Sequence, residues 1–338
     1  MTDTAAENGS IDRTTRGRRQ PLLVAAAACL AALAGSSGAQ AAPALEKLTL
    51  SFSEKTVDFL PLRVAVDAGY FKKHGIDATV RYLPAQEGIP AVLAGQVQGL
   101  GIGGADALSA EAQGAKLKLV TTFTPIYIFQ FWARPQYAKP GALKGQRVGV
   151  PSTTGSLYAA TVLILKQLGL TTSDVAITSL GSVVNVNSSL LAGSVAAAAS
   201  HPPATYQFKH GGLVDLVDLA KKKIPSVSSG VWFTQSYLNA HRALVQNVVD
   251  ALADALHRER TDRAFTEKEI TKYMGIKNKA QLDFTYNFYV NDVLPQGPLP
   301  TVAELASDKK SLSASNPKVK KVNVSEMIDP SFVKKTKQ

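Results

Sequence analysis

Two spacings of apolar residues alternate along most of this 338-residue chain. Residues 48–53 switch between apolar and polar side chains one by one, which predicts a strand with one buried face. Residues 58–74 carry apolar side chains at helical spacing and stop at Gly75, which predicts a helix that ends there. Strands and helices continue to alternate, so the sequence predicts an α/β protein with mostly parallel sheets flanked by helices.

The alternation of strands and helices extends to about residue 200, and helices alone are expected from residue 236 to about residue 290. The expected strands cover residues 48–53, 77–83, 97–103, 116–123, 147–150, 175–180 and 195–200. The expected helices cover residues 58–74, 87–94, 106–113, 156–168, 183–192 and 236–265, with two more within 268–290.

A short phrase occurs twice in matching surroundings. Leu93–Val97 reads LAGQV and Leu191–Val195 reads LAGSV, and each copy ends a predicted helix and precedes a short strand of small residues. Two similar α/β units in one chain predict two lobes with a cleft between them. In parallel sheets ligands bind beyond the carboxyl ends of the strands, so the site is expected there.

The first 41 residues have the layout of a secretory signal peptide. Arginines 16, 18 and 19 precede an uncharged stretch, 21–34, and Ala39–Ala41 supplies a cleavage site of small residues. The apolar stretch is shorter than the roughly 20 residues that a membrane span needs. We therefore expect export to the periplasm, with the general secretory and twin-arginine routes both left open.

Composition narrows the chemistry of the exported part. The single cysteine, Cys29, lies in the middle of the signal, which argues against a lipid anchor and leaves the rest without a thiol. The five histidines have no paired spacing, so neither a metal nor a cofactor is expected. The net charge of +11 is dispersed or gathered near the carboxyl end, which indicates a solvated basic surface and not a nucleic-acid site.

Three segments in order resemble hallmarks of the nitrate/sulfonate/taurine-type substrate-binding proteins of ABC importers, which share a clamshell with thiamine-pyrimidine synthases. These segments are Asp58–Val80, Ala91–Leu108 and Leu143–Ser156. The resemblance implies a two-lobed clamshell with the type II periplasmic-binding topology, closing around its solute by hinge bending.

The same resemblance implies where the lobes divide. The first lobe would hold residues 42–129 plus 231–338, and the second would hold 130–230. The chain would cross between them twice, near 129–132 and 228–232, where aromatic residues such as Trp232 are expected to form hinge core.

Two turns between a strand and a helix are expected to face the ligand. In the turn 151–156, free backbone N–H groups and the helix dipole favour an anion, although the hydroxyls suit an ordinary helix cap equally well. In the turn 103–106, glycines allow close approach of the backbone, while Asp106 either caps its helix or accepts from a ligand amine.

Other strand ends add candidates. His201 and Pro203 follow the short strand 195–200, and Ser53, Asp58 and Phe59 follow the first strand. A structural histidine and a hydrophobic staple at Phe59 are the simpler alternatives. The complete set of expected ligand-binding residues is Ser53, Asp58, Phe59, Gly104, Ala105, Asp106, Ser152, Thr153, Thr154, Gly155, Ser156, His201 and Pro203.

We therefore expect a monomeric periplasmic receptor that captures a small anionic or zwitterionic solute and delivers it to an ABC permease with its ATPase. The sulfonate, nitrate, taurine and carboxylate classes all fit. One alternative is a periplasmic sensor subunit. Another is an enzyme on the same fold, which the lack of a cysteine in the exported part disfavours because a desulfinase on this fold acts through a thiol.

Overall fold

The computed structural model describes residues 44–295, 297 and 299–333, and the expected signal peptide lies outside the described residues. One sheet contains strands β1 (Glu46–Phe52), β2 (Ile76–Tyr82), β3 (Gly99–Ile102), β4 (Leu117–Ile126) and β10 (Pro225–Thr234). Its order is β2-β1-β3-β10-β4, with β1 parallel to β2 and β3, and β10 antiparallel to β3 and β4. We call this sheet and the helices that flank it the first unit.

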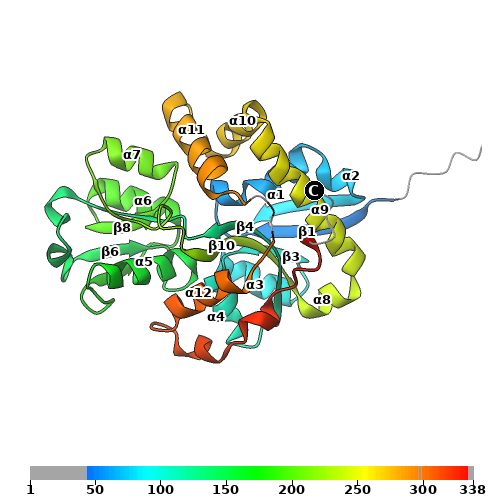
Figure 1. Ribbon diagram of the computed structural model, residues 1–338, viewed down its shortest axis with the longest axis horizontal. Helices are drawn as coiled ribbons and strands as arrows, with labels where there is room; N and C mark the ends of the chain where they lie inside the picture. The colour runs from blue at the N-terminus through cyan, green and yellow to red at the C-terminus, as the bar shows by residue number, and fades with distance from the viewer. Residues whose placement is uncertain (1–43, 296, 298, 334–338) are drawn as a thin grey trace, which may run out of the picture. The chain divides into compact units, whose positions relative to one another are not determined.

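The first unit alternates strands with helices, as the apolar pattern predicts (Figure 1). Its flanking helices are α1 (Leu60–Asp67), α2 (Tyr70–Lys73), α3 (Ala85–Leu93), α4 (Gly104–Glu111), α8 (Gln235–Ala240), α9 (Arg242–Thr261), α10 (Arg263–Met274) and α12 (Val302–Leu312). Leu50, Leu62 and Val248 are fully buried in one core between the sheet and helices α1 and α9, and apolar residues of α3, α4 and α12 form a second core.

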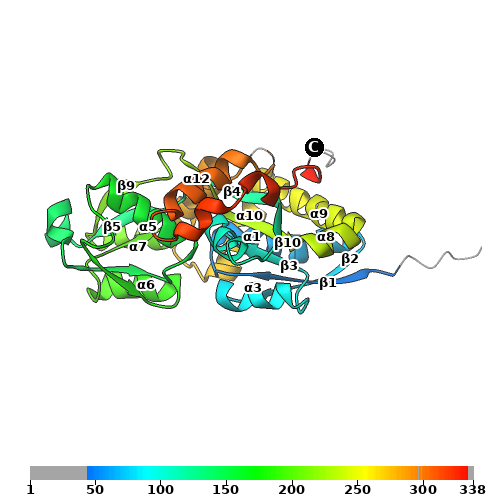
Figure 2. The ribbon, with the colours of Figure 1, turned by 90° about the horizontal axis from the view of Figure 1, so that it is seen from below.

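The second sheet has the order β7-β6-β8-β5-β9. Its strands are β5 (Gln130–Ala133), β6 (Arg147–Val150), β7 (Ala176–Ser179), β8 (Ala197–Ser200) and β9 (Val214–Asp218). Helices α5 (Gly155–Gln167), α6 (Val183–Ala192) and α7 (Ala204–His210) flank it and complete the second unit (Figure 2).

The internal repeat is confirmed by strand order and by backbone conformation. In the first unit β1 lies between β2 and β3, and in the second β6 lies between β7 and β8, with all four pairings parallel. The glycine of each repeated phrase, Gly95 and Gly193, has a positive φ, 73° and 79°, just after α3 or α6. Glycine suits both places because the left-handed conformation costs other residues energy.

Segments late in the chain contact both units. Helix α12 packs against β10 of the first sheet and against α5 of the second unit. Helix α11 (Lys279–Tyr286) continues into the π-helical turn η4 (Asn287–Val293), from which Tyr289 reaches His201 after β8. Short 3₁₀ turns complete the described elements: η1 (Val57–Phe59), η2 (Pro135–Tyr137), η3 (Pro140–Leu143), η5 (Pro317–Lys321) and η6 (Val324–Met327).

The aromatic residues at the two crossings lie mainly in the cores, as expected. Trp232 is fully buried and its indole N–H donates to the carbonyl of Ile102 over 3.1 Å. Trp132 packs edge-on against Phe208 in the second unit. Phe129 differs, because its ring also lines the cavity described below. Within the described part of the chain, no helix combines the length and apolar character that a membrane crossing requires.

Candidate functional site

The carboxyl ends of the parallel strands converge on one cavity of about 60 Å³. Ser53 follows β1 and Gly103 follows β3 in the first unit, while Pro151 follows β6 and His201 follows β8 in the second. The lining comprises Ser53, Glu54, Thr56, Asp58, Phe59, Tyr82, Pro84, Ala85, Gln86, Gly103, Asp106, Phe129, Pro151, Ser152, Thr154, Gly155, Ser156, Leu157, Gly181, Val183, His201 and Ser228. Both units therefore contribute strand-end residues to one site, as the sequence pattern predicts.

Most of the residues expected to bind a ligand lie on this cavity. Those that line it are Ser53, Asp58, Phe59, Asp106, Ser152, Thr154, Gly155, Ser156 and His201. Their position fits a role in binding, and that role stays a prediction.

The remaining expected residues point elsewhere, each for a local reason. A Cβ on Gly104 would lie 2.4 Å from Oδ2 of Asp308 in α12, so Gly104 faces the core side of α4. Ala105 is fully buried, and Thr153 is exposed outside the cavity lining. Pro203 stands before α7, where its carbonyl accepts from the side-chain amide of Gln281 over 3.1 Å.

The turn 103–106 of the first unit and the turn 151–156 of the second unit contact each other at the cavity. A Cβ on Gly103 would lie 1.9 Å from Oγ of Ser156, so only a glycine leaves room there. A Cβ on Gly155 would lie 3.0 Å from both carboxyl oxygens of Asp106, and Gly155 has a φ of +85°. The two units are thus in close contact at the site.

Neither α4 nor α5, the helices that follow these two turns, has an N-cap residue whose side chain makes a capping hydrogen bond. The N-cap residues are Gly103 for α4 and Thr154 for α5, and neither makes a capping hydrogen bond. Asp106 lies in the first turn of α4, and its carboxyl lies beside Gly155 at the start of α5. Ser152 binds its own turn, donating to the carbonyl of Thr154 over 2.9 Å.

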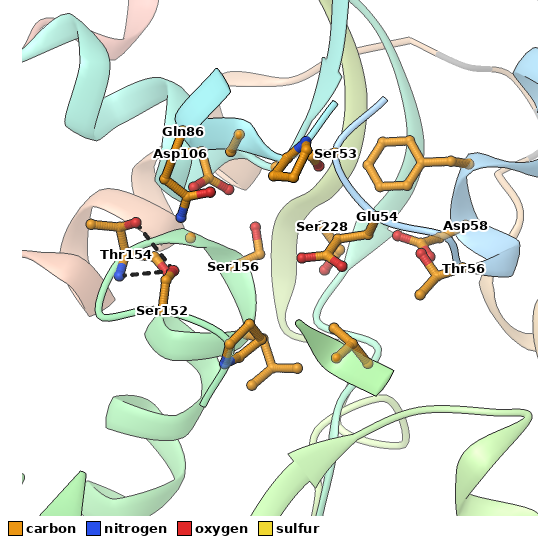
Figure 3. A pocket seen from close by; sticks show the side chains of 18 of the residues that line it. Ser53, Glu54, Thr56, Asp58, Gln86, Asp106, Ser152, Thr154, Ser156 and Ser228 are labelled. Atoms are coloured by element: carbon orange, nitrogen blue, oxygen red, sulfur yellow. Dashed lines mark hydrogen bonds between the residues drawn. The ribbon is translucent and has the colours of Figure 1, made fainter. Parts of the chain in front are cut away.

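Three carboxyl groups share the cavity (Figure 3). Burial, with the charges of Asp106 and Asp58, raises the pKa of Glu54 to about 8. Burial raises the pKa of Asp106 to about 7. Burial also raises the pKa of Asp58, while the nearby His201 opposes that rise. The described residues contain no group of acidic, histidine or cysteine side chains arranged to hold a metal ion.

His201 joins the cavity to the π-helical turn η4. Its Nδ1 lies 2.6 Å from the hydroxyl of Tyr289, which also donates to the carbonyl of Pro202 over 3.1 Å. The rings of Phe129 and Tyr289 flank the imidazole at 5.7 and 6.2 Å. His201 is therefore both the structural histidine and a cavity residue, so the two interpretations from sequence are compatible.

A second cavity, of about 470 Å³, adjoins the first along α3 and α4. The two share Ala85, Gln86, Asp106 and Thr154, and beyond them the second is lined largely by apolar residues such as Ile89 and Leu93. A solute larger than the first cavity could extend in this direction.

Sequence reasoning missed several residues of the lining. Glu54 adjoins Ser53 just after β1 and Gln86 follows the end of β2, so the strand-end rule applied to both. Phe129 was expected in hinge core. Ser228 lies on β10, an antiparallel strand whose position no local pattern reveals.

Two repeated α/β units that meet at a strand-end cavity define the periplasmic-binding-protein fold. The model of the NMT1/THI5-like family matches residues 56–259, more than half of the chain, and the chain belongs to that family.

Solved structures of this fold include two informative neighbours. The alkanesulfonate-binding protein SsuA from Xanthomonas axonopodis pv. citri, bound to MOPS, superposes with a TM-score of 0.70 at 19% identity, covering 85% of this chain and 99% of that one. A cysteine-to-serine mutant of DszB, in complex with biphenyl-2-sulfinic acid, superposes with a TM-score of 0.61 at 17% identity, covering 86% and 98%.

A relative found by sequence similarity matches less of the chain than these structures do. The riboflavin-binding protein RibY of Chloroflexus aurantiacus is 26% identical over 147 residues, which are 42% of this chain and 42% of that protein. The match thus spans less than half of that relative's length.

Proposed function

We propose that this protein is a periplasmic receptor that captures a small solute in the shared cavity and hands it unchanged to an ABC permease with its ATPase. The observation that carries the proposal is that residues of both units line the same cavity. Turns of the first unit, such as 103–106, and turns of the second, such as 151–156, meet at one cavity. A site divided between two units opens and closes when the units move, which is what delivery of a bound solute requires.

Relatives support a small polar solute. Proteins that share this fold or part of this sequence bind, by their names, alkanesulfonates or riboflavin. The division into lobes 42–129 plus 231–338 and 130–230, with a hinge at the two crossings, is part of the same proposal. So are export to the periplasm and a monomeric state.

Binding without chemistry is the simpler role for this cavity. The DszB fold neighbour is named as a desulfurization enzyme, and the crystallised mutant replaces a cysteine. No cysteine occurs among the described residues here, because the single one is Cys29. The lining offers carboxyl, hydroxyl and imidazole groups, which suffice to hold a solute by hydrogen bonds.

Native mass spectrometry of the exported protein tests the proposal. We expect a bound small molecule whose mass is the same after release as in the bacterial extract. Ser156→Phe, which fills the contact with Gly103, should abolish its retention, and Ser173→Phe on an exposed turn is the matched control. Equal retention by both variants, or a released molecule of altered mass, would contradict a receptor that uses this cavity.

A further inference from the structure

Apart from His201 and Tyr82, the ionisable side chains that line the cavity are carboxyl groups. Glu54, Asp58 and Asp106 belong to its lining, and the described lining residues include neither lysine nor arginine. Two basic side chains nearby, Lys55 and Arg63, line a separate cavity. Lys55 lies 4.8 Å from the centre of the ring of Tyr82, which lines the first cavity, and Arg63 lies 4.7 Å from that of Phe52. An anionic group in the cavity would have no lysine or arginine of the lining to balance its charge.

The start of α5, the place where an anion was expected, has a carboxyl group beside it. Asp106 places its two carboxyl oxygens next to Gly155, the first residue of α5. A negative charge at a helix amino terminus is stabilised by the helix dipole. The protein's own side chain thus meets the positive end of α5, and an anionic solute would have to approach that carboxyl.

Asp58 gives a second, independent indication that the ligand supplies a hydrogen-bond donor. The residue is only 7% exposed, and its Oδ1 makes no hydrogen bond of normal geometry with the described residues, although the nearby Thr56 hydroxyl lowers the pKa of this carboxyl. Buried polar atoms are nearly always paired, and an unpaired carboxylate oxygen requires a donor. Figure 3 shows Glu54 and Asp58 on one side of the pocket and Asp106, beside Gln86, on the other.

We infer that the solute carries a protonated nitrogen group, an ammonium or amidinium, and that Glu54, Asp58 and Asp106 hold this group. The inference rests on the proposed receptor function and narrows its solute. Among the classes considered from sequence it selects a zwitterion or cation over a molecule whose only charge is negative. Charge-assisted hydrogen bonds from N–H donors to carboxylates are the strong contacts that such a group makes.

The direction in which solute binding changes with pH distinguishes a cationic solute from an anionic one. With raised pKa values, Glu54 and Asp106 are largely or partly protonated at neutral pH in the empty cavity. A cation lowers both pKa values, so its binding releases protons and strengthens as pH rises from 6 to 8. An anion held by the protonated carboxyl groups would take up protons and bind better at pH 6.

Other titratable groups face these carboxyl groups, and their contribution to the pH dependence of binding has to be distinguished from that of the carboxyl groups. Tyr82 lies near Glu54 and Glu87, and Asp58 lies near His201 and Tyr289. The variant Glu54→Gln removes one titrating carboxyl and leaves all of these groups in place, so it isolates the contribution of Glu54.

The test separates the small molecules of a bacterial extract by whether they carry a basic nitrogen. A strong cation exchanger at about pH 2 retains amines and amino carboxylic acids, and aminosulfonic acids, which have no net charge at this pH, are recovered from the flow-through by their amino group on an aldehyde resin and pooled with the retained fraction. Each fraction is added to the ligand-stripped protein, and the melting temperature is measured. We expect a rise with the retained fraction alone. A rise with the unretained fraction, alone or as well, would overturn the inference and leave the receptor function intact. No rise with either fraction would count against the receptor function itself.

Variants and pH complete the design. The pair Glu54→Gln and Asp106→Asn should lose the rise, whereas Glu46→Gln with Asp77→Asn, exposed at the opposite strand ends, should keep it. Circular dichroism checks folding, and Glu54→Gln alone serves if the pair unfolds. At pH 6 the half-maximal rise should need on the order of tenfold more of the retained fraction than at pH 8, a difference that shrinks in Glu54→Gln. A smaller requirement at pH 6 would refute the cationic group.

Discussion

The unit built around β1, β2 and β3 and the unit built around β6, β7 and β8 share strand order and helix order, yet they present different side chains to the cavity. The first unit contributes the three carboxyl groups of Glu54, Asp58 and Asp106. The second contributes hydroxyls, such as that of Ser156, and the imidazole of His201. A repeated scaffold thus fixes where the strand ends meet, while the turns decide what chemistry each half supplies.

This difference has a consequence for stability. The carboxyl groups of the first unit lie where burial disfavours their charged form, which lowers the stability of the folded protein when they ionise. The hydroxyl groups of the second unit do not ionise and have no such effect. Such a cost is expected where a ligand supplies the compensating charge. The predictions below test the two halves against each other.

The largest effect is expected from Glu54→Gln on the empty protein at high pH. The pKa of Glu54 rises to about 8 on folding from an ordinary value of 4.5, so the folded protein holds this proton more tightly. The free energy of unfolding should therefore fall as pH rises from about 4.5 to about 8. Glu54→Gln should remove this fall and raise the stability at pH 9 by about 3 kcal/mol.

Urea unfolding at pH 5 and pH 9 measures the effect, with Glu46→Gln as the exposed control. The full linkage value is larger, but partial solvent contact of the Glu54 side chain reduces it. A parallel pH dependence in both variants would show that Glu54 is not the destabilised group.

The contact between the two turns gives the second prediction. Gly103→Ala places a Cβ 1.9 Å from Oγ of Ser156 in the other unit and 3.0 Å from the carbonyl of Ser228 in its own unit, so either the Ser156 side chain rotates or the two units move apart. Overpacking of this kind costs about 1–3 kcal/mol, which weakens solute binding by roughly 10- to 100-fold. The measurement is the amount of the stabilising extract fraction that gives half of the melting-temperature rise.

A second substitution tests the cause. Ser156→Gly removes the clashing hydroxyl and should restore much of the binding of Gly103→Ala. Gly141→Ala, where a Cβ meets nothing within 4 Å, should behave like the unchanged protein. Weak binding that Ser156→Gly does not improve would mean that the clash with Ser156 is not the cause.

The fold was more predictable than the full lining of the cavity, and the reason is locality. Strand and helix spacing, and the glycines that end helices, are written within a few residues, so the repeat around Gly95 and Gly193 was visible from sequence. Strand β10 was not, because its place between β3 and β4 depends on partners more than 100 residues away in sequence.

The site follows the same rule. Strand-end residues such as Ser53 and Ser156 were found because parallel strands bring their carboxyl ends together. The contact between Tyr289 and His201 spans 88 residues, and no spacing rule predicts it. The dominance of carboxyl groups was missed because Asp106 was left open between capping its helix and binding a ligand amine, and Glu54 was passed over.

The variant Tyr289→Phe tests whether the Tyr289 hydroxyl positions His201 for solute binding. The variant removes a hydroxyl that lies 2.6 Å from Nδ1 of His201 and 3.1 Å from the carbonyl of Pro202. Loss of a buried hydrogen bond costs about 1 kcal/mol, so binding should weaken by about fivefold if His201 is positioned by this contact. Tyr137→Phe, outside the cavity lining, is the control for loss of a hydroxyl, and unchanged binding in Tyr289→Phe would assign the contact to structure alone.

The smallest effect compares the two copies of the repeated phrase directly. Gly95→Ala and Gly193→Ala each force a side chain into the left-handed conformation, which costs about 1 kcal/mol of unfolding free energy. A Cβ at Gly95 meets nothing within 4 Å, whereas one at Gly193 lies 2.7 Å from a guanidinium nitrogen of Arg134, a flexible side chain that can move away. Urea unfolding should therefore give similar losses for both, with Gly193→Ala slightly larger, and solute binding unchanged in both. Because both glycines end helices away from the cavity lining, a selective loss of binding in either variant would mean that the repeat couples to the site in a way that its strand order does not require.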